Sequence, residues 1–206
     1  MKEMWDKRYA EEGYAYGTEP NKFLEQQLAK IPAEGKALFA AEGEGRNAVH
    51  AAKLGWKVTA FDLSESGKTK ALLLAEQENV SLNYFVENLQ NLDFKPNEFD
   101  LLVLIYAHFP AELKSEFHKK LANYVKPGGH VVFEAFSKEH IKYNSVNPKA
   151  GGPKDVAMLF SVEEVSNDFR DFEIIQLQEK VVDLNEGKYH IGQSSVVQFV
   201  GRKLNY

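Results

Sequence analysis

The sequence contains no cysteine among its 206 residues. This absence excludes disulfide bonds, thiolate metal ligands and a cysteine nucleophile, and it fits a reducing compartment. The chain also lacks an apolar run long enough to cross a membrane, and its charged first residues lack the apolar stretch of a signal peptide. We therefore expect a cytoplasmic protein with no membrane partner.

Concentrated positive charge is absent as well. The formal net charge is −5, and no basic stripe is available to neutralise phosphates, so nucleic acid is not an expected partner. The 44% hydrophobic and 27% charged residues are typical of a soluble globular protein, and the length suits one domain. We expect a single domain over residues 1–206, as a monomer or a homodimer.

Short apolar runs alternate with helical patterns from residue 38 to residue 136. The run at 99–105 is almost entirely apolar, as in a parallel strand buried on both faces, and is predicted to be central. Such alternation predicts a parallel sheet with helices on both faces. Strands are expected at 38–41, 58–62, 82–86, 99–105 and 131–136, and helices at 48–54, 64–75 and 110–125, the last ended by Lys126-Pro127-Gly128-Gly129.

The last third of the chain predicts a different arrangement. Ser161 and Glu164 have the spacing of a capping box before a short helix, and 172–183 and 189–202 form a hairpin around a turn at 185–188. The predicted fold class is α/β, a Rossmann-like, seven-stranded, mostly parallel sheet with helices on both faces and a C-terminal antiparallel hairpin. We divide it into an N-terminal flap and helix (1–30), a cofactor-binding core (36–136) and a substrate-side loop, helix and hairpin (137–206), with 143–155 as the one long loop.

A glycine loop follows the first predicted strand. Gly43 and Gly45 lie between a strand and a helix, where the backbone can approach a ligand and helix N–H groups face it. Asp62 ends the next strand, where a carboxylate can accept hydrogen bonds from ribose hydroxyls. Alternatively, the glycines only form a tight turn and Asp62 only caps a helix. Residues 43–48 also fit the G-x-G-x-x-A pattern of dinucleotide binding, which leaves an NAD-dependent oxidoreductase open.

Further segments carry a family resemblance, namely Trp5-Asp6-Lys7-Arg8-Tyr9, Tyr16-Gly17-Thr18-Glu19-Pro20-Asn21, Gly43-Glu44-Gly45-Arg46-Asn47-Ala48, 58–64 and 121–129. Over nearly the whole chain the sequence resembles class I S-adenosylmethionine-dependent methyltransferases, within them the small bacterial tellurite-resistance and thiopurine-type enzymes. The resemblance implies S-adenosyl-L-methionine as cofactor, with Ala40 to Gly45 at the methionine moiety, Asp62 at the ribose and Tyr16 in a flap. The full implied cofactor set is Tyr16, Ala40, Ala41, Glu42, Gly43, Gly45, Asn47, Asp62, Leu63, Ser64, Asn88, Leu89 and Ile105.

The chain departs from this family at two positions. The family usually has an acid at the end of the first strand and a glycine opening the loop, where this chain has Phe39 and Ala41. Glu42 either supplies the missing carboxylate or points to solvent. The departures also leave open a cofactor-binding module without catalysis.

Histidines supply the remaining candidates. His108 follows the central strand, near the expected methyl group, and is the candidate base if the acceptor needs deprotonation. His190 and Tyr143 are weaker candidates for the pocket, and His108, His190 and Glu134 match no zinc signature, so no metal is expected. Trp5, Tyr9 and Phe23 are predicted to pack on the sheet as part of an amphipathic helix. We expect methyl transfer to a small-molecule acceptor, either a thiol, a chalcogen oxyanion or an amine.

Overall fold

The computed structural model describes residues 2–205, and the sheet in this range has seven strands. Their order is β3-β2-β1-β4-β5-β7-β6; neighbours from β3 to β5 run parallel, and β7 is antiparallel to both β5 and β6. This confirms the predicted fold class and the central position of β4. The strands are β1 Lys36–Ala40, β2 Lys57–Asp62, β3 Asn83–Val86, β4 Phe99–Ile105, β5 Val125–Phe136, β6 Phe172–Glu186 and β7 His190–Lys203.

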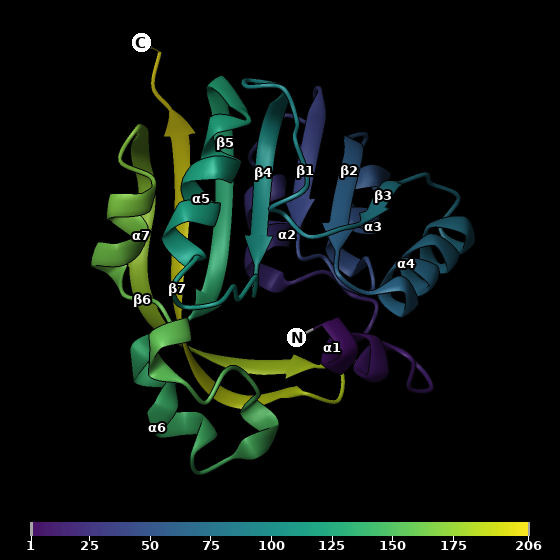
Figure 1. Cartoon of the computed structure of the whole chain (residues 1–206), viewed down its shortest axis with the longest axis vertical. Coiled ribbons are helices and arrows are strands. Elements are labelled where there is room, and N and C mark those ends of the chain that lie inside the picture. Colours follow the sequence, from purple (N-terminus) through teal and green to yellow (C-terminus); the bar gives the residue numbers. More distant parts are fainter. Residues whose placement is uncertain (1, 206) are drawn as a thin grey trace.

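Helices cover both faces of the sheet (Figure 1). In that view α5 and α7 lie in front of the sheet, while α2 and α3 lie behind it. Ser64 and Ser161 cap α4 and α7, and the predicted capping box between Ser161 and Glu164 is confirmed. The helices are α1 Lys2–Tyr9, α2 Lys22–Leu28, α3 Arg46–Lys53, α4 Glu65–Gln77, α5 Lys114–Asn123, α6 Ile141–Asn144 and α7 Val162–Asp168, with short 3-10 turns η1 Lys138–His140, η2 Pro148–Ala150 and η3 Val156–Met158.

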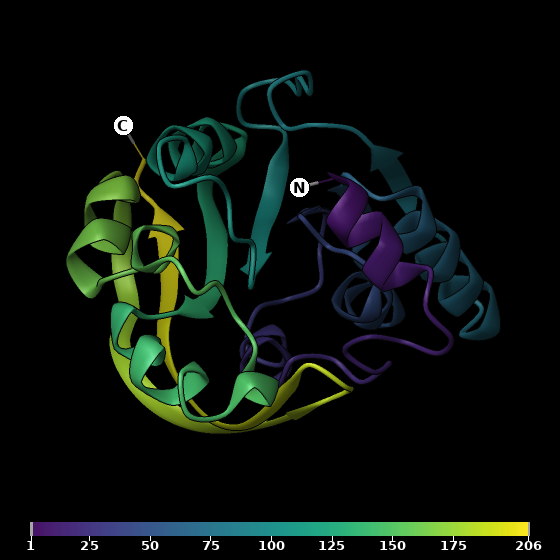
Figure 2. The same cartoon turned by 60° about the horizontal axis from the view of Figure 1, so that its bottom comes forward.

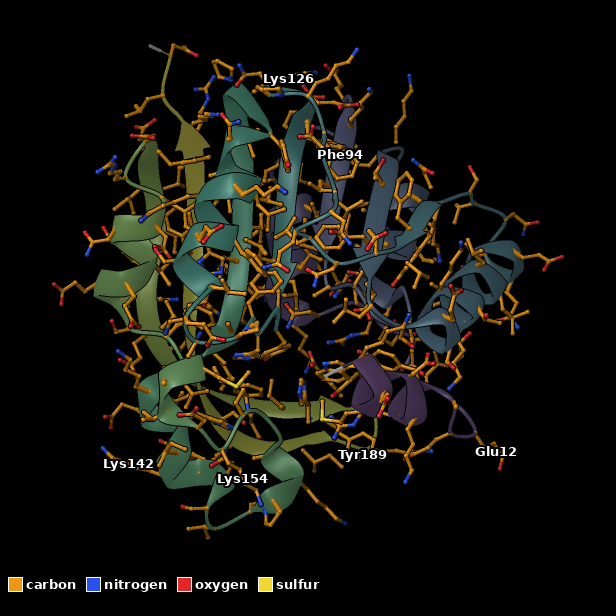
Figure 3. The ribbon with its side chains drawn as sticks, in the orientation of Figure 1. Glu12, Phe94, Lys126, Lys142, Lys154 and Tyr189 are labelled. Atoms are coloured by element: carbon orange, nitrogen blue, oxygen red, sulfur yellow. The ribbon has the colours of Figure 1, made fainter. Side chains whose placement is uncertain are left out.

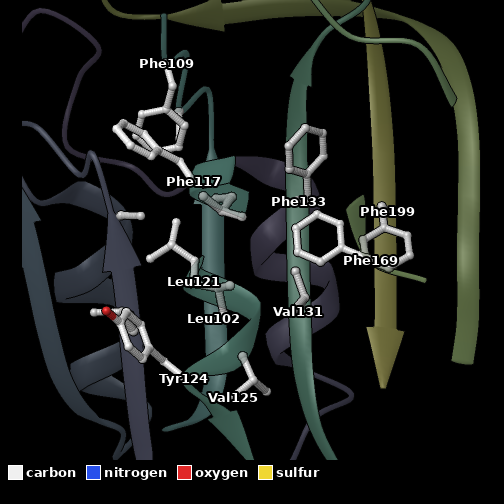
Figure 4. Close-up of a cluster of buried hydrophobic side chains, with 14 of the residues drawn as sticks. Leu102, Phe109, Phe117, Leu121, Tyr124, Val125, Val131, Phe133, Phe169 and Phe199 are labelled. Atoms are coloured by element: carbon white, nitrogen blue, oxygen red, sulfur yellow. The ribbon is translucent and has the colours of Figure 1, made fainter. Parts of the chain in front are cut away.

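Aromatic side chains dominate the core on the α5 and α7 face (Figure 4). Phe169, after α7, stacks on Phe199 of β7 with ring centroids 5.1 Å apart, and Phe133 of β5 meets Phe169 at 6.4 Å. These three rings are fully buried. Burying a large aromatic side chain stabilises a fold by roughly 1.5–3 kcal/mol, so this cluster fixes the hairpin against α7.

The helix predicted over 110–125 is wrong at both ends. Residues 111–113 form a turn, α5 ends at Asn123, and Val125 begins β5. Pro127, Gly128 and Gly129 therefore lie within β5, although their composition predicted a helix terminator. The reason is tertiary, because Phe99 of β4 pairs with Val125 and draws the chain into the sheet two residues after the helix ends.

Two other segments differ from their predictions. The loop predicted over 143–155 is interrupted by the end of α6 and by η2, whereas residues 151–155 are irregular as predicted. The N-terminal aromatics divide between two helices. Phe23 of α2 packs on the sheet as predicted, whereas α1, which carries Trp5 and Tyr9, lies against α4 instead.

Strands β1, β2 and β4 end along one side of the sheet, which we call the carboxyl edge. Both α1 and the closed end of the β6–β7 hairpin lie at this edge (Figure 1), and Figure 2 shows the hairpin curving beneath it. Glu12, which follows α1, and Tyr189, in the turn between β6 and β7, are labelled in Figure 3, and Lys188 Nζ donates to the Glu12 carbonyl. Across residues 2–205, no helix is long and apolar enough to cross a membrane.

Candidate active site

The glycine loop turns through left-handed backbone conformations immediately after β1. Ala41, Gly43 and Gly45 have φ values of 52°, 64° and 87°. Ala41 is strained there, because an L side chain in this region costs roughly 1–2 kcal/mol. The backbone therefore keeps a glycine-type conformation at the position where the family usually has glycine.

Two neighbouring residues occupy the space that the missing glycine side chains leave. A Cβ built on Gly43 would lie 2.5 Å from Tyr9 Oη, and one built on Gly45 would lie 2.5 Å from Ala71 Cβ. Gly45 therefore allows α3 and α4 to pack closely, and Gly43 allows α1 to rest on the loop. Close approach of a cofactor to the Gly43 and Gly45 backbones stays a prediction.

Glu42 caps a helix, so it does not point to solvent. Its Oε1 accepts hydrogen bonds from the backbone N–H groups of Asn47 at 3.0 Å and Ala48 at 2.8 Å, in the first turn of α3. Burial raises the pKa of its carboxyl to about 8, although the two N–H groups and nearby Arg46 lower it. The carboxylate that follows Phe39 and Ala41 thus binds the helix N-terminus.

Asp62 lies beside the glycine loop at the end of β2. Its Oδ2 accepts from Gly43 N at 3.1 Å, its Oδ1 accepts from Ser64 N at 3.0 Å, and the residue is 7% exposed. Burial raises the pKa of Asp62 to about 6, against the lowering effect of these N–H groups. The predicted acid and the predicted loop are thus in direct contact, although Gly43 and Asp62 lie in different strand–helix units.

Residues 6–15 form a cover over this part of the carboxyl edge. Asp6 accepts from Ser64 Oγ at 2.6 Å and from Ser66 N at 3.0 Å. Glu44, within the glycine loop, accepts from Ala15 N at 2.7 Å and pairs with Lys70 at 2.9 Å. The start of the cover is therefore fixed to Ser64, a predicted cofactor residue, and its end is fixed to Glu44 within the glycine loop.

An aromatic group extends from the cover to the hairpin. The His190 ring, at the start of β7, lies 4.4 Å from the Tyr16 ring, 4.6 Å from Tyr106 and 5.1 Å from Phe136. Tyr16 Oη accepts from Arg8 at 3.0 Å. The structure thus brings His190 to Tyr16, whereas Tyr143 stacks on another histidine, His140.

His108 follows β4 and is held as a neutral imidazole. Its Nδ1 lies 3.2 Å from the Met158 carbonyl, which can only accept, so Nδ1 carries the proton and Nε2 holds a lone pair. Nε2 is buried without a partner, and burial lowers the pKa of His108 to about 3. Among the described residues Nε2 is thus an acceptor without a donor, and its contact with a ligand stays a prediction.

The side chains of several predicted cofactor residues form hydrogen bonds or pack within the protein itself. Asn47 Oδ1 accepts from Asn21 N at 2.9 Å, and Asn88 Oδ1 accepts from Gln90 N at 3.1 Å. Ser64 Oγ accepts from Gly67 N in its helix cap. Ala40 and Leu89 are buried core residues, Ile105 is 8% exposed at the end of β4, and Leu63 is half-buried after Asp62. Contacts of these residues with a cofactor stay predictions.

The sequence patterns missed Tyr106 and the Arg46–Glu186 pair. Tyr106 has a φ of 52° and donates from its hydroxyl to Glu134 at 3.1 Å. Its position directly after the apolar run at 99–105 was the available signal, because residues at the ends of central parallel strands face ligands. Arg46 and Glu186 are far apart in the sequence, and no local pattern relates them. Within residues 2–205, no group of histidines and acids is arranged to hold a metal ion.

Comparisons with known proteins give the domain type and the fold. Residues 37–129 match the model of a family described as a methyltransferase domain. A search of curated proteins finds no match. Among solved structures, one reported for the conversion of a disulfide bond into a thioacetal group during echinomycin biosynthesis is 17% identical, with a TM-score of 0.78, and the match covers 99% of this chain and 92% of that one.

Two further structures have the same fold. TehB from Haemophilus influenzae is 17% identical, with a TM-score of 0.68 over 87% of this chain and 61% of that one. Magnesium protoporphyrin IX methyltransferase from Synechocystis PCC 6803, with bound SAH, is 15% identical, with a TM-score of 0.66 over 87% of this chain and 79% of that one. At these identities the structural likeness supports the fold alone.

The matched core supplies the class. Residues 37–129, from β1 through the start of β5, match a methyltransferase domain, and the glycine loop and Asp62 lie inside the match. The dinucleotide pattern at 43–48 therefore does not make the chain an oxidoreductase, and S-adenosylmethionine is the cofactor.

Proposed function

We propose that this enzyme methylates a small molecule at a soft, uncharged or thiolate sulfur, with the cofactor held at the carboxyl edge between the glycine loop and Asp62. The observation that carries the proposal is the contact between Asp62 Oδ2 and Gly43 N, because it joins a buried carboxylate to a glycine turn at one point. We also propose that residues 1–206 act as one domain, since β1 and β7 belong to one sheet.

The residues at this edge fit the cofactor. Asp62 would accept hydrogen bonds from the ribose hydroxyls, and the backbone of Ala41 to Gly43 would face the methionine moiety. Leu63 and Ile105 would flank the adenine and the opposite side of the cofactor. Tyr16 would act as a flap contact, because Glu44 holds the preceding residue, Ala15, on the glycine loop.

The groups beyond β4 favour a soft acceptor. Tyr106, Phe136 and His190 are in ring contact there, and burial lowers the pKa of His190, so the imidazole is neutral near pH 7. An oxyanion would need a free cation, and Arg46 cannot supply one because it is paired with Glu186 at 2.8 Å. Aromatic rings and neutral imidazoles instead suit polarisable sulfur.

The chemistry required of the protein is mainly alignment. The cofactor supplies an electrophilic methyl group on positively charged sulfur. His108 Nε2 would accept a hydrogen bond from an N–H or O–H group of the acceptor, separate from the reacting sulfur, and orient it. With a pKa of about 3, His108 does not retain a proton at neutral pH, so the acceptor's proton must pass to water or leave before transfer.

One similar structure supports sulfur as the reacting atom. Conversion of a disulfide into a thioacetal is chemistry at sulfur, and that protein matches this chain over nearly its full length. We therefore propose sulfur as the methyl-accepting atom for this chain and propose nothing further about the acceptor molecule.

Calorimetry with S-adenosylhomocysteine tests the cofactor site. We expect the Asp62→Asn variant to bind roughly 10- to 100-fold more weakly, the loss typical of a hydrogen bond to a charged group. Asp93→Asn, which removes an exposed acid after β3, is the matched control and should bind normally. Equal affinity of the Asp62→Asn variant and the wild type would exclude the proposed ribose contact.

Release of S-adenosylhomocysteine tests the acceptor. We expect turnover with small thiols and less with amines and oxyanions of similar size. Turnover confined to amines or oxyanions would overturn the assignment to sulfur. Binding of S-adenosylmethionine without turnover of any acceptor would favour a module that has lost catalysis.

A further inference from the structure

Glu134 of β5 is a buried carboxylate without a positive partner. It is 2% exposed, and it takes part in none of the ion pairs formed within residues 2–205. Its oxygens accept from three neutral donors, Asn21 Nδ2 at 2.6 Å, Gln198 Nε2 at 2.6 Å and Tyr106 Oη at 3.1 Å. Burying an uncompensated charge is costly even when it is hydrogen-bonded, so this position favours a cation nearby.

A pocket of about 380 Å³ leads to this carboxylate. It lies between residues 16–23, the start of α2 and the β6–β7 hairpin, which Figure 2 shows curving past α2. Gln178 is exposed, whereas Glu134 is buried, so Glu134 forms the inner end. Carboxamides are common in the lining, and they include Asn21, Gln26, Gln27, Gln176, Gln178 and Gln198.

The carboxamides are oriented in one direction. Gln178 Nε2 donates to Gln198 Oε1 at 2.9 Å, and Gln198 Nε2 donates in turn to Glu134 Oε2. Gln176 Nε2 points at the same Gln198 oxygen, at 3.5 Å. Because each N–H₂ group donates inward, the Oε1 atoms of Gln176 and Gln178 accept from no donor in the described chain. The pocket thus offers hydrogen-bond acceptors above a negative inner end.

The other charges of the pocket do not cancel that of Glu134. Arg46 and Glu186 neutralise each other at 2.8 Å. Lys22, Lys30 and Lys180, together with the acids Glu19 and Asp183, are exposed at the rim, where water screens their charge. Burial raises the pKa of Glu134, whereas the hydrogen bonds from Gln198, Asn21 and Tyr106 lower it, and no cation in the described chain pairs with this carboxyl group.

We propose that this amide pocket binds a compact organic ammonium ion, a primary amine whose N–H groups donate to Gln176 and Gln178 and whose charge compensates Glu134. The site is additional to methyl transfer and does not depend on the sulfur acceptor.

Titration of the enzyme saturated with S-adenosylhomocysteine tests the site, with n-butylamine as the probe and 1-butanol as its neutral isostere. Amide chemical shifts in NMR spectra report binding and its position. At neutral pH we expect saturable, millimolar binding of the amine, at least roughly tenfold tighter than that of the alcohol. Equal binding of the two, or no saturable shift with the amine, would overturn the proposal.

Two variants and a matched control locate the site. Glu134→Gln removes the charge at constant size and should weaken amine binding roughly tenfold or more. Gln178→Lys places an ammonium at an exposed position in the amide relay and should have the same effect on a folded protein. Gln77→Lys adds the same charge at an exposed position on α4, outside the pocket, and should bind as the wild type. Wild-type affinity in both Glu134→Gln and Gln178→Lys would contradict the assignment.

Discussion

Arg46 and Glu186 form an ion pair that joins the glycine loop to the closed end of the hairpin, with 2.8 Å between Nη2 and Oε2. Arg46 is the first residue of α3 and Glu186 is the last of β6. Their side chains are only 8% and 11% exposed, and His190 Nδ1 lies 3.2 Å from the same Glu186 oxygen. The predicted cofactor loop and the predicted acceptor side are therefore connected by one buried charge pair.

Removal of Arg46 alone should be strongly destabilising. Arg46→Met leaves Glu186 buried and unpaired, which typically costs about 3–5 kcal/mol. Urea unfolding should show this loss, and the double variant Arg46→Met/Glu186→Gln should recover most of it. Lys53→Met, which breaks the exposed pair with Glu78, is the control and should cost under about 1 kcal/mol. A similar small loss for Arg46→Met would show that the pair is not buried in solution.

The same pair predicts a pH dependence at acid pH. Burial alone would raise the pKa of Glu186, but the His190 hydrogen bond and the Arg46 charge lower it to about 2. A carboxyl group whose pKa is lower in the folded state than in the unfolded state stabilises the fold at pH values above the unfolded-state pKa, here near 4.5. This stabilisation is lost as the pH falls toward 2. The wild type should therefore lose more stability than Glu186→Gln over that range in unfolding experiments. Parallel curves for the two proteins would be inconsistent with this coupling.

Ala41→Gly should stabilise the enzyme. Ala41 has a φ of 52°, where glycine avoids the side-chain strain, so we expect a gain of about 0.5–1 kcal/mol in unfolding free energy. Cofactor affinity should be unchanged or higher. Ala40→Gly, one residue earlier in β1, should instead destabilise the protein. Glycine in a strand increases the entropy of the unfolded chain and relieves no strain in the folded one. A loss of stability in Ala41→Gly would argue against the left-handed turn.

Glu42→Gln should stabilise the enzyme at alkaline pH. One oxygen, Oε1, accepts both helix N–H groups, and a glutamine oxygen can do the same. Since burial raises the pKa of Glu42 to about 8, its stabilising contribution is complete below about 4.5 and is lost as pH rises through 8. We expect the variant to exceed the wild type by about 1–3 kcal/mol at pH 9 and by less at pH 6, by urea unfolding. A constant difference between the two pH values would contradict the burial of this charge.

His108 should affect turnover more than cofactor binding. His108→Phe removes the Nε2 acceptor, and we expect roughly tenfold or greater loss of kcat with an accepted thiol and unchanged affinity for S-adenosylhomocysteine. With a pKa of about 3, His108 should add no step to the pH profile between 5 and 8. His130→Phe, at the opposite end of the sheet, is the control. A step near pH 6.5 that disappears in His108→Phe would refute the buried neutral imidazole.

Local patterns were sufficient for the framework of the site. Gly43, Gly45 and Asp62 could be placed together from the sequence, because the ends of adjacent parallel strands share one edge and each strand was marked by its own apolar run. Ser64 and Ser161 were likewise recognisable as helix caps, since a cap depends on residues within one turn.

Contacts between distant segments could not be predicted in this way. Tyr9 was expected on the sheet, yet it lies over Gly43, because α1 packs on α4 and the glycine loop. The same limit applied to Pro127, Gly128 and Gly129, whose turn-forming preference was outweighed by pairing of β5 with β4 and β7.

The sequence by itself determined the α/β class, the glycine loop and the position of Asp62, because strand periodicity, glycine conformation and strand ends are local properties of the chain. Only the tertiary structure decided that Glu42 caps α3, that Arg46 pairs with Glu186, and that Glu134 ends an amide-lined pocket. Those arrangements depend on which segments meet across the sheet, and burial then sets the charge that each group carries.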